Sequence, residues 1–406
     1  MEVYVYFKDR NDTESVYPVG TLSCSPVDQV RSRQNMQNLL RIWLMSLTVC
    51  TASCLSLDTF PTKAVFHNYQ IHANVDSKIA QYYLQSYLTG ERQHPVFDDR
   101  IRAIYTRFEN RLPTRDELKD ISNETSVDFA AIFYADKLLS QPENKKVQSC
   151  FQSHLTNLQG NSNLIKPQRE YSIVLVPGYD YTDHGAFTGA NLAAPRRIFH
   201  NKGFDVHFIP IDAKGSVEEN ASVITNYLDK RNLDNVIIAG PSSAGPAIHL
   251  SLASYMSADA HRRVYAWMNL GGILNGVPLL DWILPAPQGW ITSLFLWREE
   301  IPESSLESMA TDVSRKRFSS LTLPSHIKII NYMGLSLSGN IAPFAYDQYR
   351  LTRLKGPNDG LTLLPDMIAP RSQTILSPST GHFFAEDPEI DLKTYALFLT
   401  LTEECG

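Results

Sequence analysis

The sequence predicts an α/β fold, a mostly parallel central sheet flanked by helices, because short apolar runs alternate with helical stretches after residue 160. Each run is bounded by turn residues and is largely hydrophobic throughout, as expected for strands that are buried on both faces. Six runs are predicted to be strands: Tyr171–Val176, Phe204–Ile209, Val236–Ala239, Val264–Leu270, Ile327–Tyr332 and Gln373–Leu376. In open sheets of this kind, ligands bind beyond the carboxyl ends of the strands. The residues that follow each run are therefore the first candidates for a functional site.

The third run leads into a tight turn at residues 240–245, and helix-compatible sequence follows. Such a strand, turn and helix can present a serine as a nucleophile if very small residues lie two positions before and two after it. Ser242 meets this condition with Gly240 and Ala244, whereas Ser243 would place a proline ring at the first position. We therefore favour Ser242 over Ser243. The alternative is an ordinary strand-to-helix turn in which a serine caps the helix.

The chain before the sheet divides into an N-terminal extension, residues 1–55, and a helical accessory region, residues 65–160. From about residue 76, apolar residues recur three and four positions apart with charges between them, which indicates amphipathic helices. One helix start is predicted with Thr114 as its cap and Glu117 three residues later. The many aromatic residues of this region are expected to form its core.

Composition narrows the class of protein. The 406 residues are 43% hydrophobic and 20% charged, which is ordinary for a globular chain that buries a large core. A net charge of −6 argues against a nucleic-acid partner. The sequence patterns of zinc ribbons, HExxH zinc enzymes, calcium loops and phosphate-binding loops do not occur. Neither a metal nor an organic cofactor is predicted.

One segment near the beginning of the chain is similar to a targeting signal. The apolar stretch between Arg41 and Cys54 is too short to span a membrane but fits the hydrophobic part of a secretory signal peptide. If translation starts at Met36, residues 36–53 resemble a bacterial lipoprotein signal, and Cys54 would be the lipidated first residue. We therefore expect an exported protein, anchored to a membrane of the bacterial envelope if Cys54 is lipidated. A buried or interfacial helix in a cytoplasmic protein is the alternative.

Cysteine usage adds one hypothesis. Removal of such a signal would leave Cys54, Cys150 and Cys405. Cys150 and Cys405 could then pair in an oxidising compartment, although the sequence does not show that they are close.

Two further residues complete a candidate catalytic set. A serine hydroxyl is a poor nucleophile, so it needs a base within hydrogen-bond reach and a third group to orient that base. His382 follows the last predicted strand, which places it at the same sheet edge as Ser242. Asp359 lies in an Asn-Asp-Gly loop after the fifth strand, although that tripeptide is also a strong turn former. Asp366 and Asp347 are the rival carboxylates.

The chain order Ser, Asp, His is that of the α/β-hydrolase superfamily, and residues 168–402 resemble its lipases and esterases. Residues 358–361 are similar to the Asp-Gly motif that precedes the histidine in many of these enzymes. Residues 174–179 resemble their first core strand and oxyanion loop, and residues 270–278 resemble the strand end after the nucleophile helix.

The resemblance implies a catalytic triad of Ser242, His382 and Asp359 that works through an acyl-enzyme. It also implies an oxyanion hole formed by the backbone amides of Ser243 and Tyr179, with the amides of Asp180 and Tyr181 as alternatives to that of Tyr179. An insertion at about 277–325, rich in Trp and Leu, would correspond to the cap that covers the acyl pocket in related lipases. Alternatively, the insertion packs on the helical region.

The function predicted from these residues is that of a serine hydrolase that cleaves carboxylic esters, similar to a lipase or carboxylesterase. Its substrate would be a small-molecule or lipid ester. Acyl transfer and thioester cleavage would use the same triad. A non-catalytic envelope lipoprotein that keeps the fold as a binding module is the alternative from another class, since fold does not settle function.

Overall fold

The computed structural model describes residues 59–160, 169–285, 293, 296, 300–378 and 380–403. The predicted extension 1–55, with its signal-like segment and Cys54, lies outside the described residues, and so does Cys405. Cys150 is disulfide-bonded, and the other four cysteines of the chain all lie outside the described residues. Among the described residues, no helix has both the length and the apolar character needed to cross a membrane.

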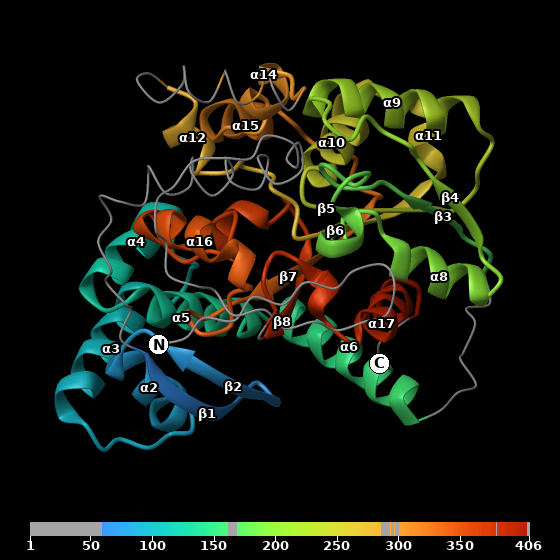
Figure 1. Ribbon diagram of the computed structural model, residues 1–406. Coiled ribbons are helices and arrows are strands. Elements are labelled where there is room, and N and C mark those ends of the chain that lie inside the picture. The colour runs from blue at the N-terminus through green and yellow to red at the C-terminus, as the bar shows by residue number, and fades with distance from the viewer. Residues whose placement is uncertain are drawn as a thin grey trace, which may run out of the picture. The chain divides into compact units, whose positions relative to one another are not determined.

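The centre of the structure is a six-stranded parallel sheet with the strand order β4-β3-β5-β6-β7-β8 (Figure 1). Every predicted run overlaps one strand, so the predicted α/β fold with a mostly parallel sheet is confirmed. β3 and β5 are buried at every position, which explains why their sequences do not alternate between apolar and polar residues. The strands are β3 (Ser172–Leu175), β4 (Asp205–Phe208), β5 (Val236–Pro241), β6 (Val264–Leu270), β7 (Lys328–Leu335) and β8 (Gln373–Pro378).

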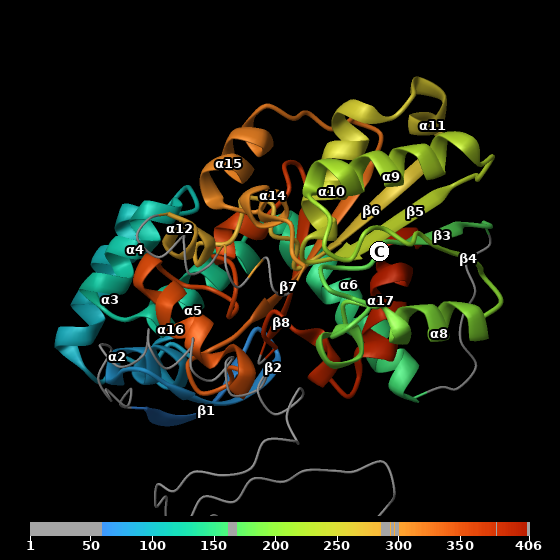
Figure 2. The same cartoon turned by 45° about the horizontal axis from the view of Figure 1, so that its top comes forward.

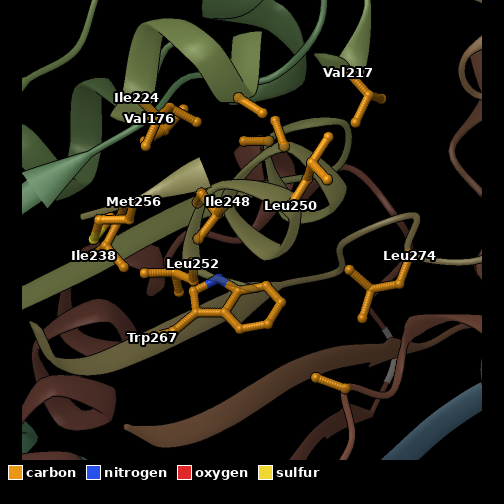
Figure 3. Packing of buried hydrophobic residues seen from close by; sticks show 14 of the residues in the cluster. Val176, Val217, Ile224, Ile238, Ile248, Leu250, Leu252, Met256, Trp267 and Leu274 are labelled. Carbon is orange, nitrogen blue, oxygen red and sulfur yellow. The ribbon is translucent and has the colours of Figure 1, made fainter. Parts of the chain in front are cut away.

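Helices cover both faces of this sheet (Figure 2). On one face, Trp267 of β6 and Ile238 of β5 pack with Ile224 and Ile248 from the covering helices (Figure 3). On the other face, Ile237 and other strand residues pack against a second set of helices. The first face is covered by α9 (Val217–Lys230), α10 (Ala244–Leu250) and α11 (Ala258–Arg263), and the second by α6 (Pro142–Gly160), α8 (Ala193–Asn201) and α17 (Ile390–Thr402).

The region before the sheet is mainly helical, as predicted, but it begins with an antiparallel hairpin that the sequence analysis did not predict. Its two-residue turn is formed by His67 and Asn68, which both have positive φ, as a tight hairpin turn requires. The predicted capping box of Thr114 and Glu117 is confirmed. The elements are β1 (Phe60–Phe66), β2 (Tyr69–Val75), α2 (Lys78–Tyr82), η1 (Tyr83–Tyr87), α3 (Pro95–Arg107), α4 (Arg115–Glu124) and α5 (Val127–Leu139).

The helical region shares a core with the sheet and protects its edge. Buried aromatic residues of α5 lie in one hydrophobic cluster with Met333 and Leu335 of β7.

The last helix of this region, α6, lies along the edge strand β8, and its amide side chains replace a neighbouring strand. Thr374 N donates to Asn144 Oδ1 and Leu376 N donates to Gln148 Oε1, both at 2.8 Å. Four residues of a helix and two of a strand each span about 6 Å, so this spacing matches the strand and blocks further pairing.

The described part of the insertion at 277–325 contains α12 (Leu280–Ile283), α14 (Glu303–Glu307) and α15 (Thr311–Ser319). Met309 and Leu280 join the core on the α9 side of the sheet. Arg317 pairs with Glu218 of α9 at 2.8 Å. This part of the insertion therefore packs beside α9, and its predicted role as a cap stays a prediction because residues 286–292, 294–295 and 297–299 lie outside the described part of the chain.

Candidate active site

The turn between β5 and α10 holds Ser242 in a strained backbone conformation. Its φ is 52°, in the left-handed region that non-glycine residues rarely adopt. Ser242 N donates to the carbonyl oxygen of Leu270 at 3.2 Å, and Ser242 O accepts from Ile273 N at 3.2 Å, so the strained residue is held by backbone hydrogen bonds to the end of β6 and the loop after it. This is the conformation expected of a nucleophile at a sharp strand-to-helix turn.

The small residues around Ser242 are explained by close backbone contacts. A Cβ at Gly240 would lie 2.6 Å from the Cβ of Ala244 and 3.0 Å from the carbonyl oxygen of Val176. The methyl group of Ala244 thus occupies the space that Gly240 leaves free, which explains why alanine is tolerated there. Ser243 has ordinary helical angles and is 8% exposed, whereas the side chain of Ser242 faces the site.

The structure brings Ser242, His382 and Asp359 together in one hydrogen-bonded line. His382 Nε2 lies 2.9 Å from Ser242 Oγ, and His382 Nδ1 lies 2.7 Å from Asp359 Oδ2. Because a carboxylate only accepts hydrogen bonds, Nδ1 carries the proton in this pair. The free lone pair of the neutral imidazole is then on Nε2, where it accepts the hydroxyl hydrogen of Ser242. This tautomer is the one that a general base beside a serine requires.

Asp359 is fixed from several directions. Its Oδ1 accepts from Leu361 N at 3.0 Å and from Thr362 N at 2.9 Å, and His382 N donates to the Asp359 carbonyl at 2.8 Å. Thr362 Oγ1 in turn donates to Gly276 O at 2.7 Å. The side chains of Asp359 and His382 are 1% and 2% exposed, so water competes little for these bonds. The carboxylate is therefore preorganised to orient the imidazole.

The rival carboxylates lie elsewhere. Asp366, in η5 (Leu364–Met367), is fully buried and bonded by Arg115 Nε at 2.8 Å, with Arg315 at 3.5 Å. Burial raises the pKa of Asp366, and the two arginines oppose that shift. Asp347 is an exposed residue in the first turn of α16 (Tyr346–Thr352). Within the described part of the chain, neither forms a hydrogen bond or ion pair with an imidazole, whereas Asp359 is hydrogen-bonded to His382.

The backbone amides of Ser243 and Tyr179, the two predicted oxyanion-hole donors, lack hydrogen-bond acceptors in the described part of the chain. The neighbouring amides of Gly178 and Asp180 donate to Ala190 O and Ala213 O, but among the described residues neither the Tyr179 amide nor the Ser243 amide donates a hydrogen bond. A Cβ at Gly178 would lie 3.4 Å from the carbonyl oxygen of Pro241, so the Tyr179 loop passes close to the serine turn. Amides without an acceptor are what an oxyanion hole requires, so the predicted role of these two donors stays a prediction.

A cavity of about 360 Å³ adjoins His382 and Asp359. Its lining combines apolar residues, among them Ile341, Ala342 and Phe383, with the charged residues Asp387, Glu389 and Lys393. Among the described residues, no cluster of three or more histidine, cysteine or acidic side chains could hold a metal ion.

Sequence reasoning missed the residues that support this site. Arg115 lies 251 positions before Asp366, and Thr362 anchors the Asp359 loop through a backbone carbonyl. No sequence pattern marks either contact. A weak signal existed for Phe383 alone, because it directly follows His382.

The strand order, the serine turn at the end of β5 and the aspartate and histidine in loops after β7 and β8 define an α/β-hydrolase fold. No protein-family model matches the chain, and no curated protein matches it. Among solved structures, it is similar to a metagenomic carboxyl esterase, with 16% identity, a TM-score of 0.48 and coverage of 64% of this chain and 89% of that one. It is also similar to the mature form of a lipase from Bacillus licheniformis, with 16% identity, a TM-score of 0.45 and coverage of 59% and 96%.

Proposed function

We propose that this protein is a serine hydrolase that cleaves carboxylic esters, with Ser242 as nucleophile, His382 as general base and acid, and Asp359 as the group that orients the histidine. The observation that carries the proposal is the unbroken line from Ser242 Oγ through both imidazole nitrogens to Asp359 Oδ2, with distances of 2.9 and 2.7 Å. Isolated buried polar pairs are common in proteins, but a hydrogen-bonded chain of three side chains that ends on a strained serine is unusual as a purely structural feature.

In the first half of the reaction, Ser242 Oγ attacks the ester carbonyl while His382 Nε2 takes its proton. The carbonyl oxygen becomes an oxyanion, which the amides of Ser243 and Tyr179 would stabilise, each by about 3 to 4 kcal/mol. Collapse of this intermediate breaks the bond to the alcohol oxygen, and His382 gives its proton to that oxygen. The products are the free alcohol and an acyl-enzyme on Ser242.

In the second half, His382 takes a proton from a water molecule, and the resulting hydroxide oxygen attacks the acyl carbon. The second tetrahedral intermediate breaks its bond to Ser242 Oγ, which recovers its proton from His382. The free acid leaves, and the enzyme returns to its starting state. Asp359 keeps its charge throughout and stabilises the imidazolium that forms twice in each cycle.

The proposal is tested by labelling with a fluorophosphonate and by turnover of p-nitrophenyl esters of graded acyl length. The folded wild-type protein should be labelled, and Ser242→Ala should abolish labelling and lower kcat by about four orders of magnitude or more. Ser243→Ala should keep the label, because alanine retains the backbone amide. A folded wild-type protein that never reacts would instead support a binding module, and loss of the label in Ser243→Ala alone would move the nucleophile by one residue.

A further inference from the structure

Three phenylalanines form a row that starts at His382. Phe383 follows the histidine, and its ring lies 5.2 Å from the imidazole, edge to face. The ring centroid of Phe344 lies 4.7 Å from that of Phe383, and that of Phe187 lies 4.5 Å from Phe344. Such centroid distances are those of favourable aromatic contacts. We call Phe187, Phe344 and Phe383 the aromatic row.

The aromatic row is assembled from three separate parts of the chain. Phe187 belongs to α7 (Gly185–Thr188), which follows the loop of Tyr179, and Phe344 belongs to η3 (Pro343–Ala345), which follows β7. α7 lies against η6 (Phe384–Glu386), since a Cβ at Gly189 would lie 3.2 Å from Ala385 N. Three segments at the carboxyl ends of β3, β7 and β8 therefore converge beside the histidine.

The outer end of the row lies at the surface of the protein. Phe187 is 56% exposed although it touches another aromatic ring. The inner end continues into the cavity of about 360 Å³, which Phe383 lines together with Ile341, Ala342 and Ala345. This volume lies within the range of roughly 300–1,000 Å³ that is usual for small-molecule sites. Phe383 therefore belongs both to the aromatic row and to the lining of the cavity beside His382.

The reaction chemistry says which half of an ester this surface would meet. In the proposed mechanism, His382 returns its proton to the oxygen of the leaving alcohol, so that oxygen must come within hydrogen-bond distance of Nε2. The alcohol substituent then extends on the histidine side of the scissile bond. The residues that line the cavity include His382, Asp359 and Phe383 but neither Ser242 nor Tyr179, whose groups would face the acyl carbon and its oxygen.

Charge in the lining of the cavity limits the alcohol further. Lys393 is the one lysine or arginine among the residues that line it, and its Nζ pairs with Asp387 Oδ2 at 2.6 Å. Glu389 adds a carboxylate, which accepts from Gln159 Nε2 at 2.6 Å. No uncompensated cation is therefore present to receive an anionic group.

From these observations we infer that the aromatic row and its cavity bind the alcohol half of the ester and select an apolar, preferably aromatic alcohol that carries no negative charge. This inference rests on the proposed function for its orientation, because the histidine side is the leaving-group side only if His382 acts as described. The row residues are specificity-determining positions, and they take no part in proton transfer.

The test compares acetate esters that differ only in the alcohol. Wild-type kcat/KM should be at least about tenfold higher for benzyl acetate than for ethyl acetate or for the carboxylated analogue, 4-(acetoxymethyl)benzoate. Phe344→Ala should reduce the benzyl-to-ethyl ratio about tenfold. Phe187→Ala, at a mostly exposed position, should reduce it several-fold without disturbing the fold. The matched control is Phe97→Ala in the helical region, where the ring packs against His94 and Tyr82, and it should leave the ratio unchanged.

A second series separates the two halves of the ester. With p-nitrophenol as the common alcohol, the ratio of kcat/KM for butyrate and acetate should be the same in Phe344→Ala and in the wild type. If Phe344→Ala changes the butyrate-to-acetate ratio but leaves the benzyl-to-ethyl ratio unchanged, the inference is wrong, because the row would then contact the acyl chain.

Binding in the absence of turnover distinguishes failure of this inference from failure of the proposed function. Saturation-transfer NMR of benzyl alcohol with Ser242→Ala should show binding, and the additional change Phe344→Ala should abolish it. If the wild type is labelled by the fluorophosphonate but benzyl alcohol does not bind, the inference is wrong and the proposed function stands. If the label fails and benzyl alcohol still binds at the row, the proposed function is wrong and the apolar site stands without its assigned role in selecting the leaving alcohol.

Discussion

The loop 357–363 and the η5 turn that follows it each hold a buried carboxylate, but the two carboxylates face different parts of the molecule. Asp359 in the loop faces the sheet edge, where it accepts from His382 and from two backbone amides. Asp366 in the turn faces the helical region, where Arg115 binds it. Both side chains are almost fully withdrawn from water. The partner, and not burial or position in the loop, therefore determines what each carboxylate can do.

The two partners have different chemical consequences. An imidazole can change its protonation during a reaction, so a carboxylate beside it can assist catalysis. A guanidinium keeps its charge at all accessible pH values, so a carboxylate beside it can only hold structure. Asp366 O also accepts from Asn275 N at 3.2 Å, so the Arg115 contact ties the helical region to the strand end that supports Ser242.

The largest effect should come from exchanging the charge at Asp359. Asp359→Asn keeps the shape of the side chain but lets an amide nitrogen face His382, which favours the wrong tautomer. We expect kcat for p-nitrophenyl acetate to fall by about 10⁴ while the urea midpoint of unfolding changes little. Asp366→Asn is the matched control, because it should lower stability and reduce kcat by less than about tenfold. Equal losses of kcat in both variants would show that the assignment of roles is wrong.

The next effect concerns stability alone. Arg115→Ala removes one partner of a buried ion pair and leaves the Asp366 carboxylate with the more distant Arg315. Leaving a buried charge poorly compensated should lower the free energy of unfolding by about 3 kcal/mol, measured by urea unfolding followed by circular dichroism. In the double variant with Asp366→Asn, much of this loss should be recovered. If the double variant instead loses the sum of what the two single variants lose, Arg115 and Asp366 do not stabilise the fold through their contact with each other.

The sequence was sufficient for the sheet because the strands are buried on both faces, and uniform apolar runs such as Val236–Ala239 have few other interpretations. It was also sufficient to propose Ser242, because the close contact between positions 240 and 244 requires small residues there, and these are visible in the sequence. His382 and Asp359 could be proposed from their positions after strands, and the structure places them within hydrogen-bond distance of each other.

Other features were beyond the sequence because they depend on partners that are distant in the chain. The contact of Asp366 with Arg115 is one example, and the pairing of Asn144 and Gln148 with β8 is another. The hairpin before α2 was missed because its first strand carries Pro61 and its turn, His67 and Asn68, lacks glycine. The residues of the aromatic row come from three segments that are far apart in the sequence, so no local pattern could indicate the row.

A third buried carboxylate, Asp128 of α5, extends the comparison, because its neighbour is another carboxylate. Asp128 Oδ2 accepts from Asp76 N at 2.7 Å, and its Oδ1 accepts from Ser338 N at 3.0 Å, at the joint between the helical region and the loop after β7. Asp76 pairs with Arg353 at 2.9 Å. Burial, and then the charge of Asp76, raise the pKa of Asp128 to about 7. Burial and the neighbouring carboxylate together make Asp128 a carboxyl group that holds its proton near neutrality.

The smallest of the three effects should appear in the pH dependence of stability. Between the ordinary carboxyl pKa of about 4 and a folded pKa of about 7, the folded state keeps a proton on Asp128 that the unfolded state has lost, so this group's contribution to stability decreases as pH rises. Asp128→Asn cannot titrate and should remove that slope. Relative to wild type, its free energy of unfolding should therefore improve by about 1 kcal/mol or more between pH 5 and pH 7.5. Asp99→Asn, which removes an exposed ion pair with Arg102, is the control, and its free energy of unfolding should depend on pH as that of the wild type does. If the difference between Asp128→Asn and wild type stays constant with pH, Asp128 is ionised in the folded protein and its pKa is not raised.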